Sequence, residues 1–170
     1  MFDLTLIVLA RALHVMSGVA WAGATFMLAS VIVPLMLRHA DEGAGRWLGL
    51  AARRAGMVSA GAALLTIASG IYLFVALHPH DDSLNGHVLK IGASAALLSL
   101  AVAFLVSRPA GRKLGQLQMS AVAGESRSAQ VEQERARLRR RMAISTRIAA
   151  ALLGLSILAM ATFRYAGAFS

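Results

Sequence analysis

Three residues of the first long apolar segment have the types and spacing expected for contact with a flat, metal-bearing ring. His14, Gly18 and Trp21 stand at positions i, i+4 and i+7, which on an α-helix lie within roughly 60° of one another. An imidazole can ligate iron, a glycine leaves a gap, and an aromatic ring offers a stacking surface. Ionisable residues within membrane spans are mostly functional. We therefore expect a site at His14; the alternative is a neutral histidine hydrogen-bonded to a neighbouring helix.

Arg11, Lys90 and Arg164 are the only basic residues outside two long connecting segments. All three map to the outer half of the expected spans, where a charge costs roughly 2.5–3.5 kcal/mol on insertion scales. At least one of them should therefore meet an anion. For Lys90 and Arg164 the alternative is that the long side chains reach the outer headgroups.

This charge pattern favours a tetrapyrrole, or another carboxylated organic ligand, over a bare metal cation. A haem needs one or two axial imidazoles, an apolar slot and partners for two carboxylates, whereas a copper ion would be repelled by the cations and needs several ligands. The sequence thus predicts haem with His14 as iron ligand and with Arg11, Lys90 and Arg164 beside the carboxylates. If the iron is six-coordinate, His87 is the expected second ligand.

A cluster of possible metal ligands lies in the short connection after the second apolar run. His78 and His80 stand beside Asp81 and Asp82, and His87 follows shortly after. Imidazoles and carboxylates together can collect divalent copper or zinc. The spacing matches no strict metal signature, so the two readings are an outer copper site and a solvated turn.

The elements that must position these residues are membrane-spanning helices. The chain has 170 residues, of which 58% are hydrophobic and 15% charged, with mean hydropathy +0.66; soluble proteins have about 45–50% apolar residues. Apolar runs near the length of a span predict an all-α, polytopic membrane protein, a single four-transmembrane-helix bundle. The expected helices cover about residues 3–37, 55–77, 88–106 and 128–166.

Charge in the connections predicts the orientation of the bundle. The two long segments carry nearly all of the basic residues and should be cytoplasmic, whereas the short connection is acidic and, with both termini, should lie outside. The net charge of +9 does not indicate nucleic acid binding, because the basic residues lie between apolar runs. Arg108 and Pro109 are expected to end the third helix.

The fourth helix should extend well into the cytoplasm. Its basic run Arg139–Arg141 is expected to anchor on anionic lipid headgroups, and a docking surface for a partner is the alternative. A stripe of small residues on the second helix predicts close helix packing. A homodimer and a redox partner are both open.

Several short motifs carry a family resemblance. Leu13-His14 precedes Trp21-Ala22-Gly23, and Pro34 follows at the far end of the helix. Ser69-Gly70-Ile71-Tyr72 in the second helix, and the third-helix stretch that ends at Lys90, add to the pattern. Together they resemble the CopD-like (copper-resistance D) family of small four-helix membrane proteins, which is related to the HemJ-type protoporphyrinogen oxidases.

The resemblance implies two kinds of activity. The CopD-like side implies copper uptake or handling at the periplasmic face of a bacterial inner membrane. The HemJ side implies a b-type haem, a first-helix histidine matching His14 and a third-helix lysine matching Lys90, although the Pro-Arg pair of that group is absent. Three functions are therefore expected as alternatives: a haem-bearing membrane oxidoreductase, a copper-handling protein, and a non-catalytic assembly subunit.

Overall fold

The chain folds into four long helices in a computed structural model, which describes residues 3–38, 43–78, 83–122 and 128–169. Each is long and apolar enough to cross a membrane, and the described residues contain no strand. The prediction of an all-α, multi-pass four-helix bundle is confirmed. In chain order the elements are α1 (Leu4–Met27), η1 (Leu28–Ile32), α2 (Val33–Arg38), α3 (Gly43–Leu77), α4 (Leu84–Val102), η2 (Ala103–Ser107), α5 (Arg108–Val122), α6 (Ala129–Thr162) and η3 (Phe163–Phe169).

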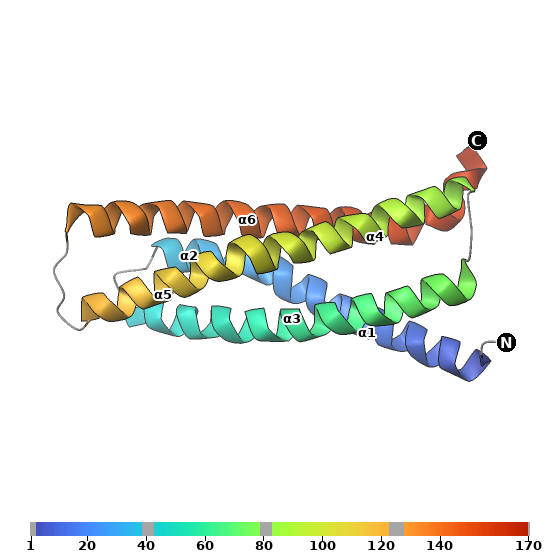
Figure 1. Cartoon of the computed structure of the whole chain (residues 1–170), viewed down its shortest axis with the longest axis horizontal. Helices are drawn as coiled ribbons and strands as arrows, with labels where there is room; N and C mark the ends of the chain where they lie inside the picture. Colours follow the sequence, from blue (N-terminus) through green and yellow to red (C-terminus); the bar gives the residue numbers. More distant parts are fainter. Residues whose placement is uncertain (1–2, 39–42, 79–82, 123–127, 170) are drawn as a thin grey trace.

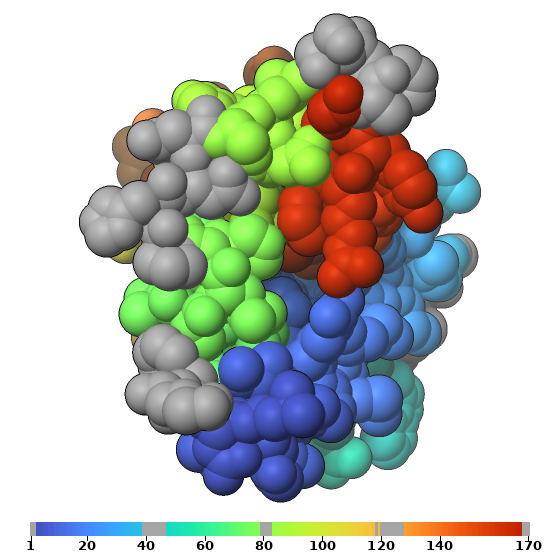
Figure 2. Space-filling model, turned by 90° about the vertical axis from the view of Figure 1, so that its right-hand side faces the viewer, coloured from blue at the N-terminus to red at the C-terminus, as the bar shows by residue number. Residues whose placement is uncertain are grey.

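The helices are arranged as two antiparallel pairs. The segment α1–η1–α2 runs beside α3, and the segment α4–η2–α5 runs beside α6, with both termini at the same end (Figure 1). Figure 2 looks onto this end, where the start of α1, the end of α3, the start of α4 and η3 come together. We call it the outer end, following the charge distribution.

Pro109 does not end the third helix, and this prediction was wrong. The chain continues as α5, because the π-helical turn η2 ends two residues before the proline: the amide of Arg108 bonds to the carbonyl of Ala103, five residues back. The wider turn accommodates a residue that lacks an amide donor and would clash with an ordinary helical turn. Pro34 follows the π-helical turn η1 at the same offset, and there the helix continues as α2.

Two apolar clusters hold the bundle together. One lies at mid-height and draws on both helix pairs, with Trp21 and Ala22 from α1, Ala63 from α3, Ala96 from α4 and Leu153 from α6 among its members. Most of its members are alanines, which let helix backbones approach closely. The second cluster joins the inner parts of α2, α5 and α6; it contains Val33, Met36, Ala110, Leu114, Leu138 and Met142.

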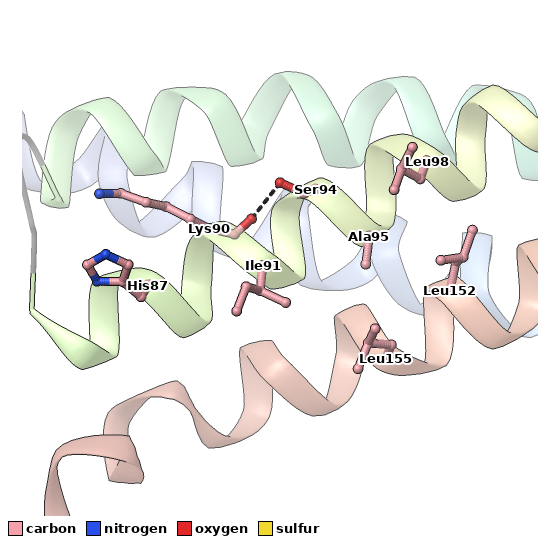
Figure 3. A pocket seen from close by; sticks show the side chains of 8 residues that line it. All are labelled: His87, Lys90, Ile91, Ser94, Ala95, Leu98, Leu152 and Leu155. Carbon is pink, nitrogen blue, oxygen red and sulfur yellow. Dashed lines mark hydrogen bonds between the residues drawn. The ribbon is translucent and has the colours of Figure 1, made fainter. Parts of the chain in front are cut away.

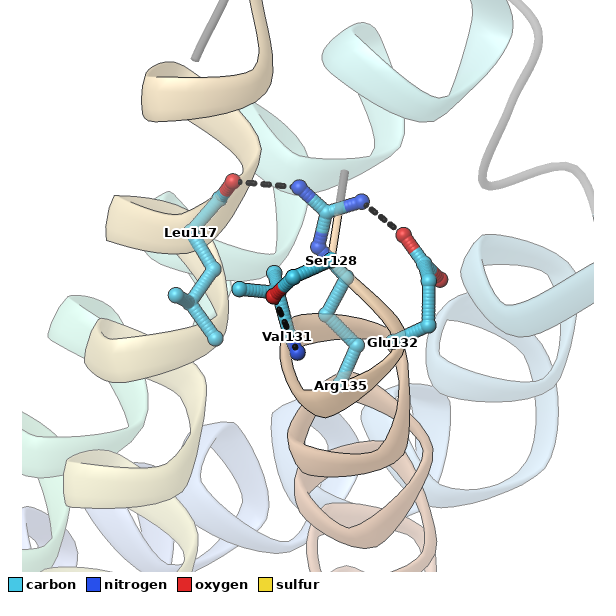
Figure 4. Close-up of polar contacts among 5 residues, drawn as sticks. All are labelled: Leu117, Ser128, Val131, Glu132 and Arg135. Atoms are coloured by element: carbon cyan, nitrogen blue, oxygen red, sulfur yellow. Dashed lines mark hydrogen bonds and ion pairs between the residues drawn. The ribbon is translucent and has the colours of Figure 1, made fainter. Parts of the chain in front are cut away.

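A buried arginine closes the inner hairpin. Arg135 of α6 is only 8% exposed; it donates to the carbonyl of Leu117 in α5 at 2.7 Å and to Glu132 at 2.6 Å (Figure 4). The bond to Leu117 ties α6 to α5, and the ion pair with Glu132 gives the buried guanidinium a charged partner. The inner part of α6 is thus a packed helix, continuous with its membrane-spanning part.

Candidate functional site

His14 of α1 is held against α3 in the outer half of the first helix pair. Its Nδ1 atom lies 2.8 Å from the carbonyl oxygen of Thr66. Because a carbonyl only accepts, Nδ1 carries the proton and donates. Ser69 Oγ lies 3.4 Å from the same nitrogen, and the Ser69 hydroxyl donates to the carbonyl of Leu65 at 2.6 Å. The imidazole is therefore fixed in position and in tautomer by the backbone of α3.

Gly70 makes this close approach possible. A Cβ atom on Gly70 would lie 2.9 Å from Cε1 and 3.2 Å from Nδ1 of His14, and real Cβ atoms essentially never come within 3.0 Å of another heavy atom. The ring thus fills the space that any other residue would need. Gly70 is required here for space rather than for an unusual backbone angle.

A second layer of hydroxyl groups supports the same contact. Thr66 donates to Ser17 Oγ at 2.9 Å, and Ser17 donates to the carbonyl of Leu13 at 2.6 Å. Ser17, Thr66 and Ser69 are all buried. These bonds tie the turn of α1 that contains His14 to the turn of α3 that receives its ring.

The free ring nitrogen of His14 is its chemically available atom. Since Nδ1 donates to Thr66, a neutral imidazole has its lone pair on Nε2. Among the described residues Nε2 has no hydrogen-bond partner. Such an atom can ligate a metal ion or accept a proton, and the ring is half-buried, so a ligand can reach it.

Gly18 and Trp21 share the face of α1 that carries His14, as the spacing predicted. Both contribute to packing: the open side of Gly18 faces the methyl group of Thr66, where an added Cβ would stand at an ordinary 3.7 Å. Trp21 is 3% exposed and belongs to the central apolar cluster. The gap at Gly18 is thus occupied by α3, and contact of these two residues with a bound ring stays a prediction.

The three outer cations lie on three different elements. Arg11 of α1 and Arg164 of η3 are exposed, and the Arg164 guanidinium stands 6.0 Å from the ring centre of Phe163. Lys90 of α4 is half-buried and lines a groove together with His87 (Figure 3). The structure therefore brings Lys90 and His87 together, whereas His14 is not among the residues that line this groove.

The predicted copper ligands are only partly described. His78 lies between the rings of Phe74 and Phe163, with ring centres 6.4 and 5.9 Å away. His80, Asp81 and Asp82 lie outside the described residues. In the described part of the chain, no three His, Asp or Glu residues are grouped as metal ligands. The outer copper site stays a prediction.

Three residues of the His14 site were missed by sequence reasoning as site residues. Thr66, Ser69 and Gly70 were interpreted as part of a small-residue packing stripe or as a family motif. The signal for their role was a hydroxyl residue and a glycine one turn apart on α3, facing a histidine on a neighbouring helix. That pairing becomes visible only when the register of α1 against α3 is known.

Comparisons with protein-family models, with curated proteins and with solved structures found no match to this chain. Its class follows from the fold alone: a multi-pass α-helical membrane protein in contact with the lipid bilayer. What it does must be argued from the site.

Proposed function

We propose that the chain is a membrane redox protein that holds a b-type haem in its outer half, with Nε2 of His14 as iron ligand. The observation that carries the proposal is the hydrogen bond from Nδ1 of His14 to the Thr66 carbonyl. Histidines that ligate a metal almost always donate their other ring N–H to a carbonyl, carboxylate or water, which fixes the tautomer and raises the basicity of the ligating nitrogen. When bound, the haem would supply one-electron chemistry at its iron.

Two residues of α1 suit the iron and one carboxylate of a haem with one protein ligand. Nε2 of His14 is left without a hydrogen-bond partner among the described residues, and Arg11 precedes His14 by one turn on the same helix with its side chain exposed. Residues three apart are neighbours on a helix surface, so Arg11 can meet a carboxylate of a ring bound at His14. His87 lines a groove on the other helix pair, and the proposal does not depend on it as second ligand.

The protein's own residues hold the imidazole of His14 in a fixed orientation. The Thr66 carbonyl accepts the Nδ1 proton, and Gly70 provides the space for the ring beside α3. The bond from Thr66 to Ser17 holds the two backbones in register. This arrangement costs no reorganisation at the moment of ligand binding, which favours affinity.

Resemblance to the CopD-like and HemJ-type proteins supports the proposal at His14 and Lys90. We further propose that the protein resides in a bacterial inner membrane with the site on the periplasmic side. This orientation is supported by the basic inner segments and by the acidic short connection.

The test is an absorption spectrum together with iron and copper analysis of the purified protein from haem-replete cells. We expect a Soret band with about one iron per chain, and both should be lost in His14→Ala while the helical circular-dichroism signal is retained. His87→Ala is the matched control: an unchanged spectrum supports the single ligand, and a shift from a low-spin to a high-spin spectrum would assign His87 as the second. Colourless protein with bound copper, lost when His78, His80 and His87 are replaced, would instead establish the copper-handling alternative.

A further inference from the structure

The inner part of α6 presents a row of arginines on the side that faces away from the bundle. At about 100° per residue these side chains lie within about 120° of one another. All of them are exposed, and we call them the basic face: Arg137, Arg140, Arg141 and Arg147. The opposite side of the same helix packs into the inner apolar cluster. The basic face is therefore open to whatever approaches α6 from outside the bundle.

The acidic residues of this part of α6 are bonded to other cations. Glu132 accepts a hydrogen bond from Arg135 at 2.6 Å (Figure 4), and Glu134 accepts one from Lys113 of α5 at 2.6 Å. The hydrogen bond and the charge of Lys113 lower the pKa of Glu134, and the charge of Arg137 adds a smaller effect. Both carboxylates thus hold the inner hairpin together and do not form ion pairs with the basic face.

The basic face is a concentration of positive charge that the described part of the chain does not neutralise. Arg140, Arg141 and Arg147 form no hydrogen bond or ion pair with any described residue. Arg137 and Arg141 stand four residues apart, and like charges at this spacing destabilise a helix. A surface of this kind attracts an external anion.

Distance from the bilayer distinguishes a lipid from a soluble partner. Arg147 directly precedes residues 148–163, a stretch without charge in the membrane-spanning part of α6. The helix continues inward without a break (Figure 1), so that Arg140 lies about 10 Å and Arg137 about 15 Å beyond Arg147 along its axis. The headgroup layer is only about 5–8 Å thick on each side of a bilayer. Most of the basic face therefore extends past the headgroups into water.

We propose that the basic face docks an acidic helix of a soluble protein on the inner side of the membrane. Arginines along one helix face complement carboxylates at the same helical spacing, and each guanidinium can bind a carboxylate through two N–H groups. Single-stranded RNA is bound through aromatic stacking platforms, and residues 129–147 contain no aromatic side chain. The surface involves neither His14 nor a haem, so its failure would leave the proposed function untouched.

Binding of defined probes to the full-length chain in phosphatidylcholine nanodiscs tests the proposal by fluorescence anisotropy. The main probe is a stapled helical peptide with glutamates along one face. It is compared with a helical peptide of the same composition whose glutamates are spread around the helix, and with an oligouridylate. We expect the one-faced peptide to bind most tightly, with an affinity that falls as the salt concentration rises. Equal binding of the two peptides would overturn the helical match, and tighter binding of the oligouridylate would overturn a protein partner.

Variants assign the binding to α6. Arg140→Gln/Arg141→Gln should weaken binding of the one-faced peptide by about tenfold, and Arg137→Gln alone by about threefold. The matched control is Arg53→Gln/Arg54→Gln, which removes two adjacent exposed arginines from the inner part of α3 and should leave the affinity unchanged. Circular dichroism checks that each variant is folded. An equal loss of affinity in both double variants would show attraction by net charge alone and would overturn the docking surface.

A nitroxide label tests whether anionic lipid covers the basic face instead. The chain contains no cysteine, so Ala136→Cys, at an exposed position beside Arg137, can be labelled singly. We expect the label to be fully accessible to a water-soluble nickel complex, and equally so when phosphatidylglycerol replaces part of the phosphatidylcholine. Protection from the complex in the phosphatidylglycerol nanodiscs would place the face against lipid headgroups and would overturn the proposal.

Discussion

Replacing Gly70 by alanine should break the contact that positions His14. The new Cβ would stand 2.9 Å from Cε1 of the imidazole and 3.2 Å from Nδ1, and the three nearest atoms all belong to His14. The ring must therefore move, and its 2.8 Å bond to the Thr66 carbonyl is lost.

The magnitude follows from three terms. Overpacking costs about 1–3 kcal/mol, and the lost hydrogen bond about 0.5–1.5 kcal/mol. Alanine returns up to about 1 kcal/mol over glycine through its helix propensity. The free energy of unfolding should therefore fall by about 0.5–4.5 kcal/mol, measured by equilibrium unfolding in mixed micelles of dodecyl maltoside and sodium dodecyl sulfate.

A control glycine and a second background make the reasoning refutable. Gly61 lies on the same helix, and a Cβ there would meet nothing within 4 Å; Gly61→Ala should be neutral or stabilising by up to about 1 kcal/mol. In a His14→Ala background the cost of Gly70→Ala should vanish, because the clashing ring is gone. An equal loss of stability in both backgrounds would refute the packing argument.

Three further substitutions test other parts of the fold. Gly92→Ala should lower the free energy of unfolding by about 1–3 kcal/mol in the same micelle assay, because the Cβ would press on backbone as well as side-chain atoms of α6. Arg135→Ala removes the charged hydrogen bond that joins α6 to the Leu117 carbonyl of α5, and should cost about 1.5–3 kcal/mol and speed hydrogen exchange in the inner hairpin, whereas alanine at an exposed arginine of α6 should do neither. Pro109→Ala removes the cause of the π-helical turn, so that segment should revert to an ordinary α-helix; spin labels on either side of Ser107 would then report a changed distance, and an unchanged distance would contradict our explanation.

The number and type of helices could be predicted because bilayer thickness imposes them. A run of about 20 apolar residues in lipid must be helical, because only then do its backbone N–H and C=O groups all form hydrogen bonds. The prediction of one spanning helix for each of the four runs is confirmed. The helix boundaries were harder to predict, because α3 begins at Gly43, well before the expected start at about residue 55, and α5 continues to Val122. Apolar content marks the lipid-embedded part of a helix but not its polar extension.

The sequence predicted the residues of the candidate site that lie on α1, but not those that α3 contributes. The shared face of His14, Gly18 and Trp21 follows from helical periodicity alone. The role of Thr66 and Gly70 depends on how α1 is placed against α3, which is set by packing over the whole pair. For the same reason, the sequence placed Arg11, Lys90 and Arg164 around one ligand only because all three lie in the outer half of their helices. In the structure they lie on three separate elements.

The inner ends of the two helix pairs are joined by polar and apolar side chains, whereas the outer halves pack through small residues. At the inner side, the apolar cluster around Met142 and the buried Arg135 join three elements, and the Arg108 side chain stacks 4.0 Å above Phe104 and donates to the carbonyl of Gly56. Anchoring of this kind fixes the relative depth and rotation of the helices. Small residues then suffice to pack the outer halves, and they leave room beside the backbone: Gly70 admits the imidazole of His14 in one pair, and the close contact at Gly92 borders the groove in the other. Each pair therefore has its own opening beside a glycine in the outer half, and a substitution in one should leave the other intact.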